Sequence, residues 1–167
     1  MADTNNPFQI VYDALWEMAD RNKSLTSMIK LNNKESYDKW IGFKTDVSTA
    51  DFPELALVVD GGSTNFQWSS SHSQFTRMYS WSLTTGNFTI CNYHCILWEL
   101  YRAMVDWDKV LCSLQWDGSQ IVTNAAIAEL TEGTLRIEQN RGIRGWSSIF
   151  AIDVEFVVPT ELMRIPV

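Results

Sequence analysis

Near the end of the chain, residues 150–158 read Phe-Ala-Ile-Asp-Val-Glu-Phe-Val-Val. Large apolar side chains at every second position share one face of this stretch, whereas Asp153 and Glu155 share the other face. This period of two predicts a β-strand with one buried side. Pro159 ends the strand because proline cannot donate a ladder hydrogen bond. A strand of this kind is typical of an antiparallel sheet that is covered on one face.

Two earlier segments predict further strands of the same sheet. Residues 54–60 are apolar on both faces until Asp60-Gly61-Gly62 breaks the pattern, which predicts a central strand. Residues 75–84 alternate large or aromatic side chains with small or polar ones. Together they predict a long β-hairpin with a polar tip at 63–74, closed by Thr85-Gly86-Asn87. Shorter strands are expected at 121–127 and 134–138, followed by a loop at 139–145.

Helical spacing of apolar residues occurs twice. Residues 7–20 carry a stripe at three- and four-residue intervals, with Asn6 as a good N-cap and Pro7 suited to the first turn. Residues 92–107 carry a second stripe of the same spacing. The sequence therefore predicts an α+β fold, in which an antiparallel β-sheet with a long β-hairpin has two main helices packed on one face.

The length of 167 residues suits one domain, 1–167. Within it we expect an N-terminal helix at 1–20, an irregular segment at 21–52 and an α+β core at 53–159. The content of 46% hydrophobic residues excludes an intrinsically disordered chain. A net charge of −7 argues against a protein that grips nucleic acid phosphates. No apolar run is long enough to span a membrane, and the polar start of the chain does not resemble a signal peptide.

The residues that carry chemistry are few. Cys91, His94 and Cys95 invite a zinc interpretation, but no second Cys/His pair follows to complete four ligands. The alternative is that the two cysteines pack as small apolar residues at the start of a helix. Asp153 and Glu155 could act as an acid and base pair or hold a divalent ion, but a solvated outer strand face is the better explanation of this spacing. We therefore expect no catalytic residue, no bound metal and no cofactor.

Aromatic residues are unusually abundant, with eight Trp among 167 residues. A stacking platform for single-stranded nucleic acid would need a basic groove beside them. Arg77 stands nearly alone among the aromatic residues of the hairpin. The aromatic surplus is more typical of a protein–protein interface.

The order of elements resembles a family of phage proteins. The helix, the strand Leu55-Ala56-Leu57-Val58-Val59-Asp60 and the hairpin ending at Thr85-Gly86 are similar to the tail terminator or tail completion (head–tail joining) proteins of long-tailed bacteriophages. The later segments Ile96-Leu97-Trp98-Glu99-Leu100 and 145–155 resemble the family's second helix and last strand. The resemblance covers residues 52–158 in topology and pattern.

This resemblance implies a non-enzymatic virion protein that is made in the cytoplasm of the host bacterium. Its copies would form a homo-oligomeric ring, expected to be a hexamer, that caps the tail tube. Its partners would be the tail tube protein and the head–tail connector or neck proteins. The genomic DNA would pass through the ring without sequence-specific binding, and no membrane is involved.

Candidate interface residues follow from the expected topology. Phe66 and Trp68, in the hairpin loop, are candidates for contact with a neighbouring subunit, or else fold back on their own domain. Arg141, Arg144 and Trp146 are candidates for a second interface. Asp153 and Glu155 are candidates for the lining of the lumen, where acidic groups repel DNA.

Two other functions stay open at this stage. The protein could be another phage neck or head–tail connector protein. It could instead be a cytosolic adaptor domain that binds a peptide along an exposed sheet edge. An adaptor would be a monomer or dimer, so the oligomeric state separates these classes.

Overall fold

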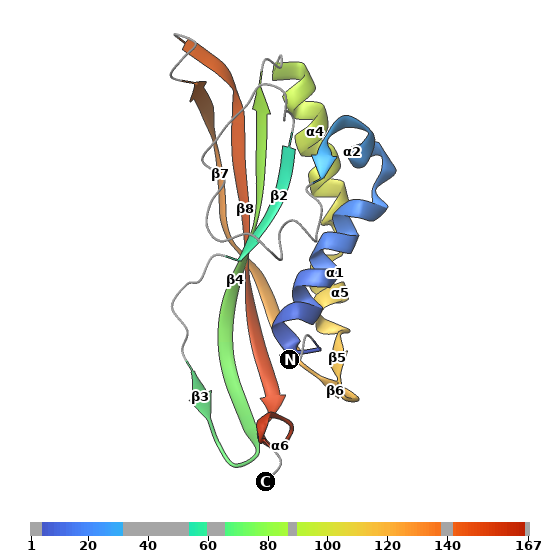
Figure 1. Cartoon of the computed structure of the whole chain (residues 1–167), viewed down its shortest axis with the longest axis vertical. Helices are drawn as coiled ribbons and strands as arrows, with labels where there is room; N and C mark the ends of the chain where they lie inside the picture. Colours follow the sequence, from blue (N-terminus) through green and yellow to red (C-terminus); the bar gives the residue numbers. More distant parts are fainter. Residues whose placement is uncertain (1–4, 32–53, 60–65, 87–89, 138–141, 166–167) are drawn as a thin grey trace.

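The computed structural model describes residues 5–31, 54–59, 66–86, 90–137 and 142–165 (Figure 1). The elements follow one another in this order: α1 Pro7–Arg21, α2 Lys23–Met28, β1 Lys30–Leu31, β2 Glu54–Val59, β3 Gln67–Trp68, β4 His72–Gly86, α4 Ile90–Ala103, α5 Trp107–Cys112, β5 Gln115–Trp116, β6 Ser119–Gln120, β7 Val122–Ile137, β8 Gly142–Pro159 and α6 Thr160–Met163.

Most of the strands form one sheet, in the order β1-β2-β4-β8-β7. The short strand β3 also belongs to this sheet and pairs with β4. Every described pair in this sheet is antiparallel except β1 with β2, which is parallel. The small β5–β6 hairpin stands apart. The predicted α+β fold with an antiparallel sheet is thus confirmed. The sheet is long and strongly twisted, and it extends beyond the helices at both ends (Figure 1).

Two strands are longer than their sequence patterns indicate. The strands expected at 121–127 and 134–138 are one strand, β7, which passes through Glu132 and Gly133 without a turn because both stay paired with β8. Three register shifts along β7 disturb the alternation of side chains. The prediction of a loop at 139–145 is also wrong from residue 142 onward, because β8 begins at Gly142.

The segment expected to be irregular, 21–52, contains regular structure where the structure describes it. Helix α2 begins after Asn22, whose side-chain Oδ1 accepts a hydrogen bond from the Leu25 amide at 3.1 Å. Leu25 is fully buried and supplies the apolar anchor of this short helix. The Asn22 Nδ2 also donates to the Glu99 backbone carbonyl at 3.0 Å, which ties α2 to α4. Residues 32–53 lie outside the described part.

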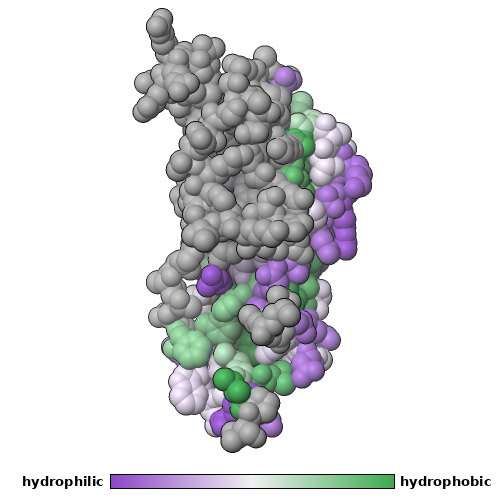
Figure 2. All heavy atoms as spheres, viewed as in Figure 1, coloured by the Kyte–Doolittle hydropathy of each residue, from purple (hydrophilic) through white to green (hydrophobic). Residues whose placement is uncertain are grey.

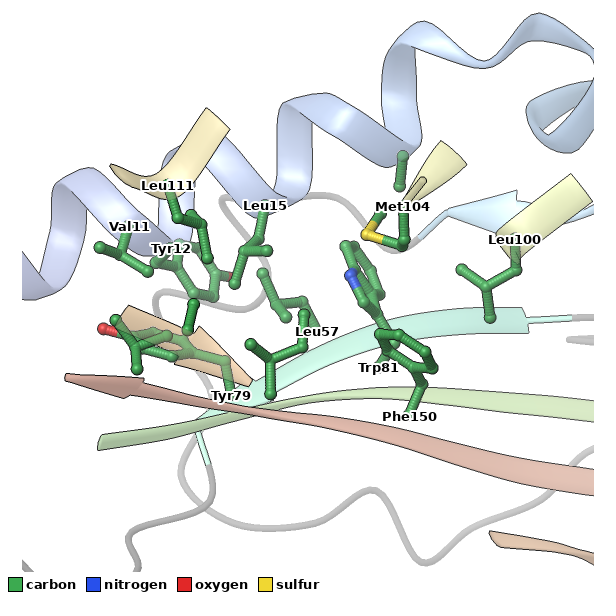
Figure 3. Packing of buried hydrophobic residues seen from close by; sticks show 14 of the residues in the cluster. Val11, Tyr12, Leu15, Leu57, Tyr79, Trp81, Leu100, Met104, Leu111 and Phe150 are labelled. Carbon is green, nitrogen blue, oxygen red and sulfur yellow. The ribbon is translucent and has the colours of Figure 1, made fainter. Parts of the chain in front are cut away.

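The helices lie on one face of the sheet, and the core fills the space between them (Figure 3). Val11 and Leu15 of α1 and Leu100 and Met104 of α4 are buried against the sheet. The N-cap predicted for α1 is present, because the Asn6 side chain accepts from the Gln9 amide at 3.0 Å. The helix expected at 92–107 is α4, which begins earlier, at Ile90, and already ends at Ala103; a separate helix, α5, begins at Trp107. Among the described residues, no helix is long and apolar enough to cross a membrane.

Candidate interaction surface at the hairpin end

The end of the β3–β4 hairpin is a tight, hydrogen-bonded turn. The Ser69 amide donates to the His72 carbonyl at 2.8 Å, and the Ser69 Oγ accepts from the amides of Ser71 and His72. Serine side chains that bond to nearby backbone groups stabilise such turns. The serine-rich composition that predicts a loop here therefore has a local structural cause.

The first residue of α6 fastens this turn to the body of the protein. The Thr160 amide donates to the Ser71 carbonyl at 3.1 Å, and the Thr160 Oγ1 donates to the Ser69 carbonyl at 2.8 Å. The Thr160 Oγ1 also lies 3.1 Å from the Ser73 Oγ, and both side chains are buried. A buried network of this kind holds the hairpin end in one position.

Replacing Thr160 by valine is expected to loosen the hairpin end. The variant keeps the size of the side chain but loses its bond to the Ser69 carbonyl and leaves the Ser73 hydroxyl buried without this partner, which typically costs about 1–3 kcal/mol. Backbone amides at Ser71 and His72 should exchange hydrogen at least about tenfold faster. As a control, Thr26→Val removes a hydroxyl whose weaker bond, 3.5 Å to the Lys23 carbonyl, is exposed. Unchanged exchange at Ser71 in the Thr160 variant would contradict the anchoring role.

Four phenylalanine rings form a continuous cluster beside the anchored turn. Phe75 and Phe156 face each other on adjacent strands, with ring centroids 5.1 Å apart. Phe8 of α1 meets both rings edge to face, at 5.4 Å from each. Phe66 stacks on Phe75 at 5.9 Å. The cluster joins the start of α1 to the hairpin, and its inner members are buried while Phe8 and Phe66 are exposed.

The side chain of Arg77 packs against one ring of this cluster. The guanidinium carbon of Arg77 is 4.8 Å from the centre of the Phe8 ring, in the geometry of a cation–π contact. Below Phe8, the Tyr79 hydroxyl donates to the Phe8 carbonyl at 3.1 Å. Burial raises the pKa of the Tyr79 hydroxyl far above its ordinary value, and the nearby Arg77 charge offsets part of the rise.

The raised pKa of Tyr79 gives the fold a defined sensitivity to alkaline pH. An unfolded tyrosine ionises near its ordinary pKa of about 10, whereas Tyr79 stays protonated in the folded state. Its contribution is therefore complete below pH ~10 and is lost as the pH rises from there toward the folded pKa. The difference in free energy of unfolding between the wild-type protein and Tyr79→Phe should shrink above pH ~10. A difference that does not change with pH in urea titrations would contradict the burial of this hydroxyl.

Phe66 and Trp68 are the exposed aromatic residues of the hairpin, at 53% and 66% exposure. Trp68 pairs with Ser73 across the hairpin, and Phe66 stacks on Phe75, so both side chains lie on the helix side of the sheet. Met163 and Ile165, beside the same end, are exposed as well. Figure 2 shows hydrophobic residues gathered at the lower end of the molecule, where β3 and α6 lie in Figure 1. We call Phe8, Phe66, Trp68 and Arg77 the hairpin surface.

The other predicted interface residues do not form a loop. Arg144 and Trp146 lie within β8, where Trp146 pairs with Thr85 on one side and Thr134 on the other. The loop position predicted for Arg144 is therefore wrong, whereas Trp146 lies in the strand in which its segment was expected, and the second interface stays a prediction. Arg141 lies outside the described residues.

The predicted acidic pair lies on the sheet face opposite the helices. Asp153 pairs with Met78 and Ala126, and its side chain is exposed. Glu155 is half-buried, and its Oε1 accepts from the Gln74 Nε2 at 2.8 Å and the Thr123 Oγ1 at 3.3 Å. These contacts give Glu155 the role of a cross-strand hydrogen-bond acceptor.

The candidate metal residues do not belong to a complete set of metal ligands among the described residues. Cys91, His94 and Cys95 are all exposed on α4, on the side away from Ile96 and Leu100. The expectation that the cysteines pack as small apolar residues is therefore wrong. No group of three or more His, Cys, Asp or Glu side chains within the described ranges is arranged to hold a metal ion.

The sequence patterns did not identify several exposed apolar residues. Ile127 and Leu130 of β7 are 52% and 46% exposed, although they pair with the core residues Ile152 and Phe150. They lie on the helix side of the sheet, at its edge. Ile127 continues the alternation of 121–127, so periodicity gives no sign of its exposure, and the register shift after Ile127 puts Leu130 on the same face in spite of the odd spacing.

Comparison with known proteins gives no relative from which a role could be taken: the sequence matches no family model, and no curated protein matches it.

Proposed function

We propose that this protein is a non-enzymatic structural component of a bacteriophage virion. It would be a tail terminator or tail completion protein whose copies form a ring, expected to be a hexamer, at the end of the tail tube. Its partners would be the tail tube protein and the head–tail connector. The observation that carries this proposal is the hairpin surface, where two large aromatic side chains stand exposed on an anchored end.

The anchoring matters because a fixed surface loses little conformational entropy when it binds. The bonds from Thr160 to Ser69 and Ser71 hold the turn in place, and Phe66 is supported by the stacked rings beneath it. Exposed aromatic residues on a preorganised support are typical anchors of protein–protein interfaces. Trp and Tyr are also enriched at interfaces in general.

The polar face of the sheet suits the wall of a channel. Asp153 is exposed there, and Glu155 lies next to it on the same strand and the same face. In a ring, carboxylates on the inner wall would repel DNA phosphates and let the genome slide without binding. We therefore assign the sheet face that carries Asp153 to the lumen and the helix layer to the outside.

Native mass measured by light scattering on a sizing column tests the proposal. The protein should give a discrete species of several subunits, expected to be six, whose population rises with concentration. Asp153→Asn with Glu155→Gln serves as a matched variant, because it removes two charges without changing size and should leave the mass unchanged. A monomer or dimer at every concentration would instead support a peptide-binding adaptor, for which the open edge of β7 offers a place for strand addition.

A further inference from the structure

Three strands of the sheet, β1, β3 and β7, pair on one side only among the described residues, and two of these edges, those of β3 and β7, carry large exposed apolar side chains. Within the described part of the chain, β7 pairs only with β8, and β3 pairs only with β4. Strand β3 lies on the side of β4 that also carries β2, whereas β7 lies beyond β8 on the opposite side. The outer backbone groups of an edge strand are a template for pairing with another chain.

Each edge carries large apolar side chains on the same face of the sheet. Phe66 and Trp68 flank the β3 edge, and Ile127 and Leu130 flank the β7 edge. All four are on the helix side, because they pair or stack with residues of that side. A strand added at either edge would therefore continue both the sheet and its apolar face.

The directions of the strands allow the two edges to meet. Strand β3 is antiparallel to β4, and both β4 and β7 are antiparallel to β8. It follows that β3 runs opposite to β7. When two copies stand side by side in the same orientation, β3 of one copy and β7 of the next form an antiparallel pair, the arrangement with perpendicular hydrogen bonds.

Charge favours this pairing over the pairing of two identical edges. Strand β7 contains Glu129, Glu132 and Arg136, which sum to a charge of −1, so a β7–β7 pair would join two stretches of the same net charge. The stretch from Phe66 to Arg77 contains no Asp or Glu and ends in a cation. The stretch from Phe66 to Arg77, with a charge of +1, therefore suits β7, with a charge of −1, better than a second copy of the same edge does.

From these four observations we infer that neighbouring copies of this chain join edge to edge, with β3 of one copy against β7 of the next, so that Phe66 and Trp68 cover Ile127 and Leu130. The interface uses two different surfaces of each copy. Such a heterologous contact repeats from subunit to subunit and closes into a ring when the rotation permits. The inference rests on the proposed function and identifies the surface that receives the hairpin.

The positions of the two apolar pairs along the strands set the inclination of the strands in the ring. Phe66 and Trp68 lie level with Phe75 and Ser73, whereas Ile127 and Leu130 lie level with Tyr79 and Trp81 through their partners on β8. This offset of roughly six residues corresponds to about 20 Å along the strand. The four strands β3, β4, β8 and β7 together span about 19 Å across the sheet. For the two edges to meet with this offset, the strands must tilt by about 45° from the ring axis, close to the strand tilt of closed sheets.

Cross-linking of single-cysteine variants tests the inference. In a background with Cys91→Ser, Cys95→Ser and Cys112→Ala, one preparation carries Gln67→Cys and another carries Ala126→Cys, because both residues are exposed on the same face of β3 and β7 and leave the apolar anchors intact. The two are mixed and treated with a short bismaleimide. Circular dichroism first establishes that each variant is folded. The matched control replaces Ala126→Cys by Trp98→Cys, because Trp98 is 63% exposed on the outer side of α4.

The inference predicts at least about ten times more cross-linked dimer from the Gln67→Cys and Ala126→Cys mixture than from the control mixture. Neither variant alone should form dimers above the control level. Assembly seen by light scattering without this preferential cross-link would overturn the edge-to-edge contact and leave the ring proposal standing. Absence of both assembly and cross-linking at the highest soluble concentration would overturn both.

Discussion

Replacing Phe66 and Trp68 together by serine is expected to raise the concentration needed for assembly by about 100- to 1,000-fold. Each aromatic residue at the centre of an interface typically contributes about 2 kcal/mol, and every 1.4 kcal/mol changes an association constant about tenfold. The fold should be retained, because both side chains are more than half exposed in the single chain. Light scattering over a series of concentrations measures the shift.

The matched control for this double variant is Trp98→Ser. Trp98 is as exposed as Trp68 but lies on α4, away from the hairpin surface. Its replacement removes the same kind of side chain and should leave the assembly concentration within about threefold of the wild-type value, since surface substitutions outside an interface usually change stability by no more than 0.5 kcal/mol. Equal effects of both variants would mean that loss of exposed tryptophan, rather than the hairpin surface, weakens assembly.

Trp81→Ala is expected to cost about 3–5 kcal/mol of folding free energy, the range typical of a large aromatic residue removed from a core. Trp81 is buried at 1% exposure between the sheet and the helices. Its ring points toward Met104 of α4 and lies beside Phe150 of β8 (Figure 3). The substitution would leave a cavity between the sheet and the helices at the centre of the core. Urea unfolding followed by circular dichroism gives the change in free energy.

Trp81→Phe distinguishes the loss of volume from the loss of polarity. Among the described residues, the Trp81 Nε1 is buried without a hydrogen-bond partner, so phenylalanine removes no hydrogen bond there. This variant should lose no more than about half as much free energy as the alanine variant, because much of the ring remains. Similar losses for both variants would contradict the packing of Trp81 as the cause.

The parts of the fold that sequence predicts well are those in which burial and periodicity agree. The alternation in 150–158 identifies the inward residues of β8, and Phe150, Ile152, Val154, Phe156 and Val158 are all buried. The N-cap and Pro7 place the start of α1 correctly. At these positions the local preference of the chain and its tertiary packing favour the same conformation.

Sequence patterns fail where pairing between distant residues decides the structure. Gly133 suggests a turn, yet it pairs with Ser147 inside a long ladder. Arg144 lies between glycines and suggests a loop, yet it belongs to β8. Helix α2 begins after Asn22, whose side chain caps the helix and also binds the Glu99 carbonyl of α4, a residue distant in sequence. Local propensities cannot report such long-range pairing.

The candidate site, too, was predicted in part from the sequence and missed in part. Phe66 and Trp68 are exposed as residues of a polar loop often are, but Phe66 also stacks on Phe75 of its own domain, the alternative that the sequence left open. The contribution of Phe8 and Arg77 was missed, since their contact joins α1 to β4 across the fold. Ile127 and Leu130 were missed because their exposure depends on where the helix layer ends, which no local pattern records.

Electron micrographs of the assembled protein, sorted into class averages, test the central claim most directly. The account predicts closed rings with a central channel, built from about six copies that all use the same two surfaces. Closed two-fold dimers would contradict it, because they would show that one surface pairs with its own copy. Open filaments would contradict the closed ring while keeping the heterologous contact between neighbours.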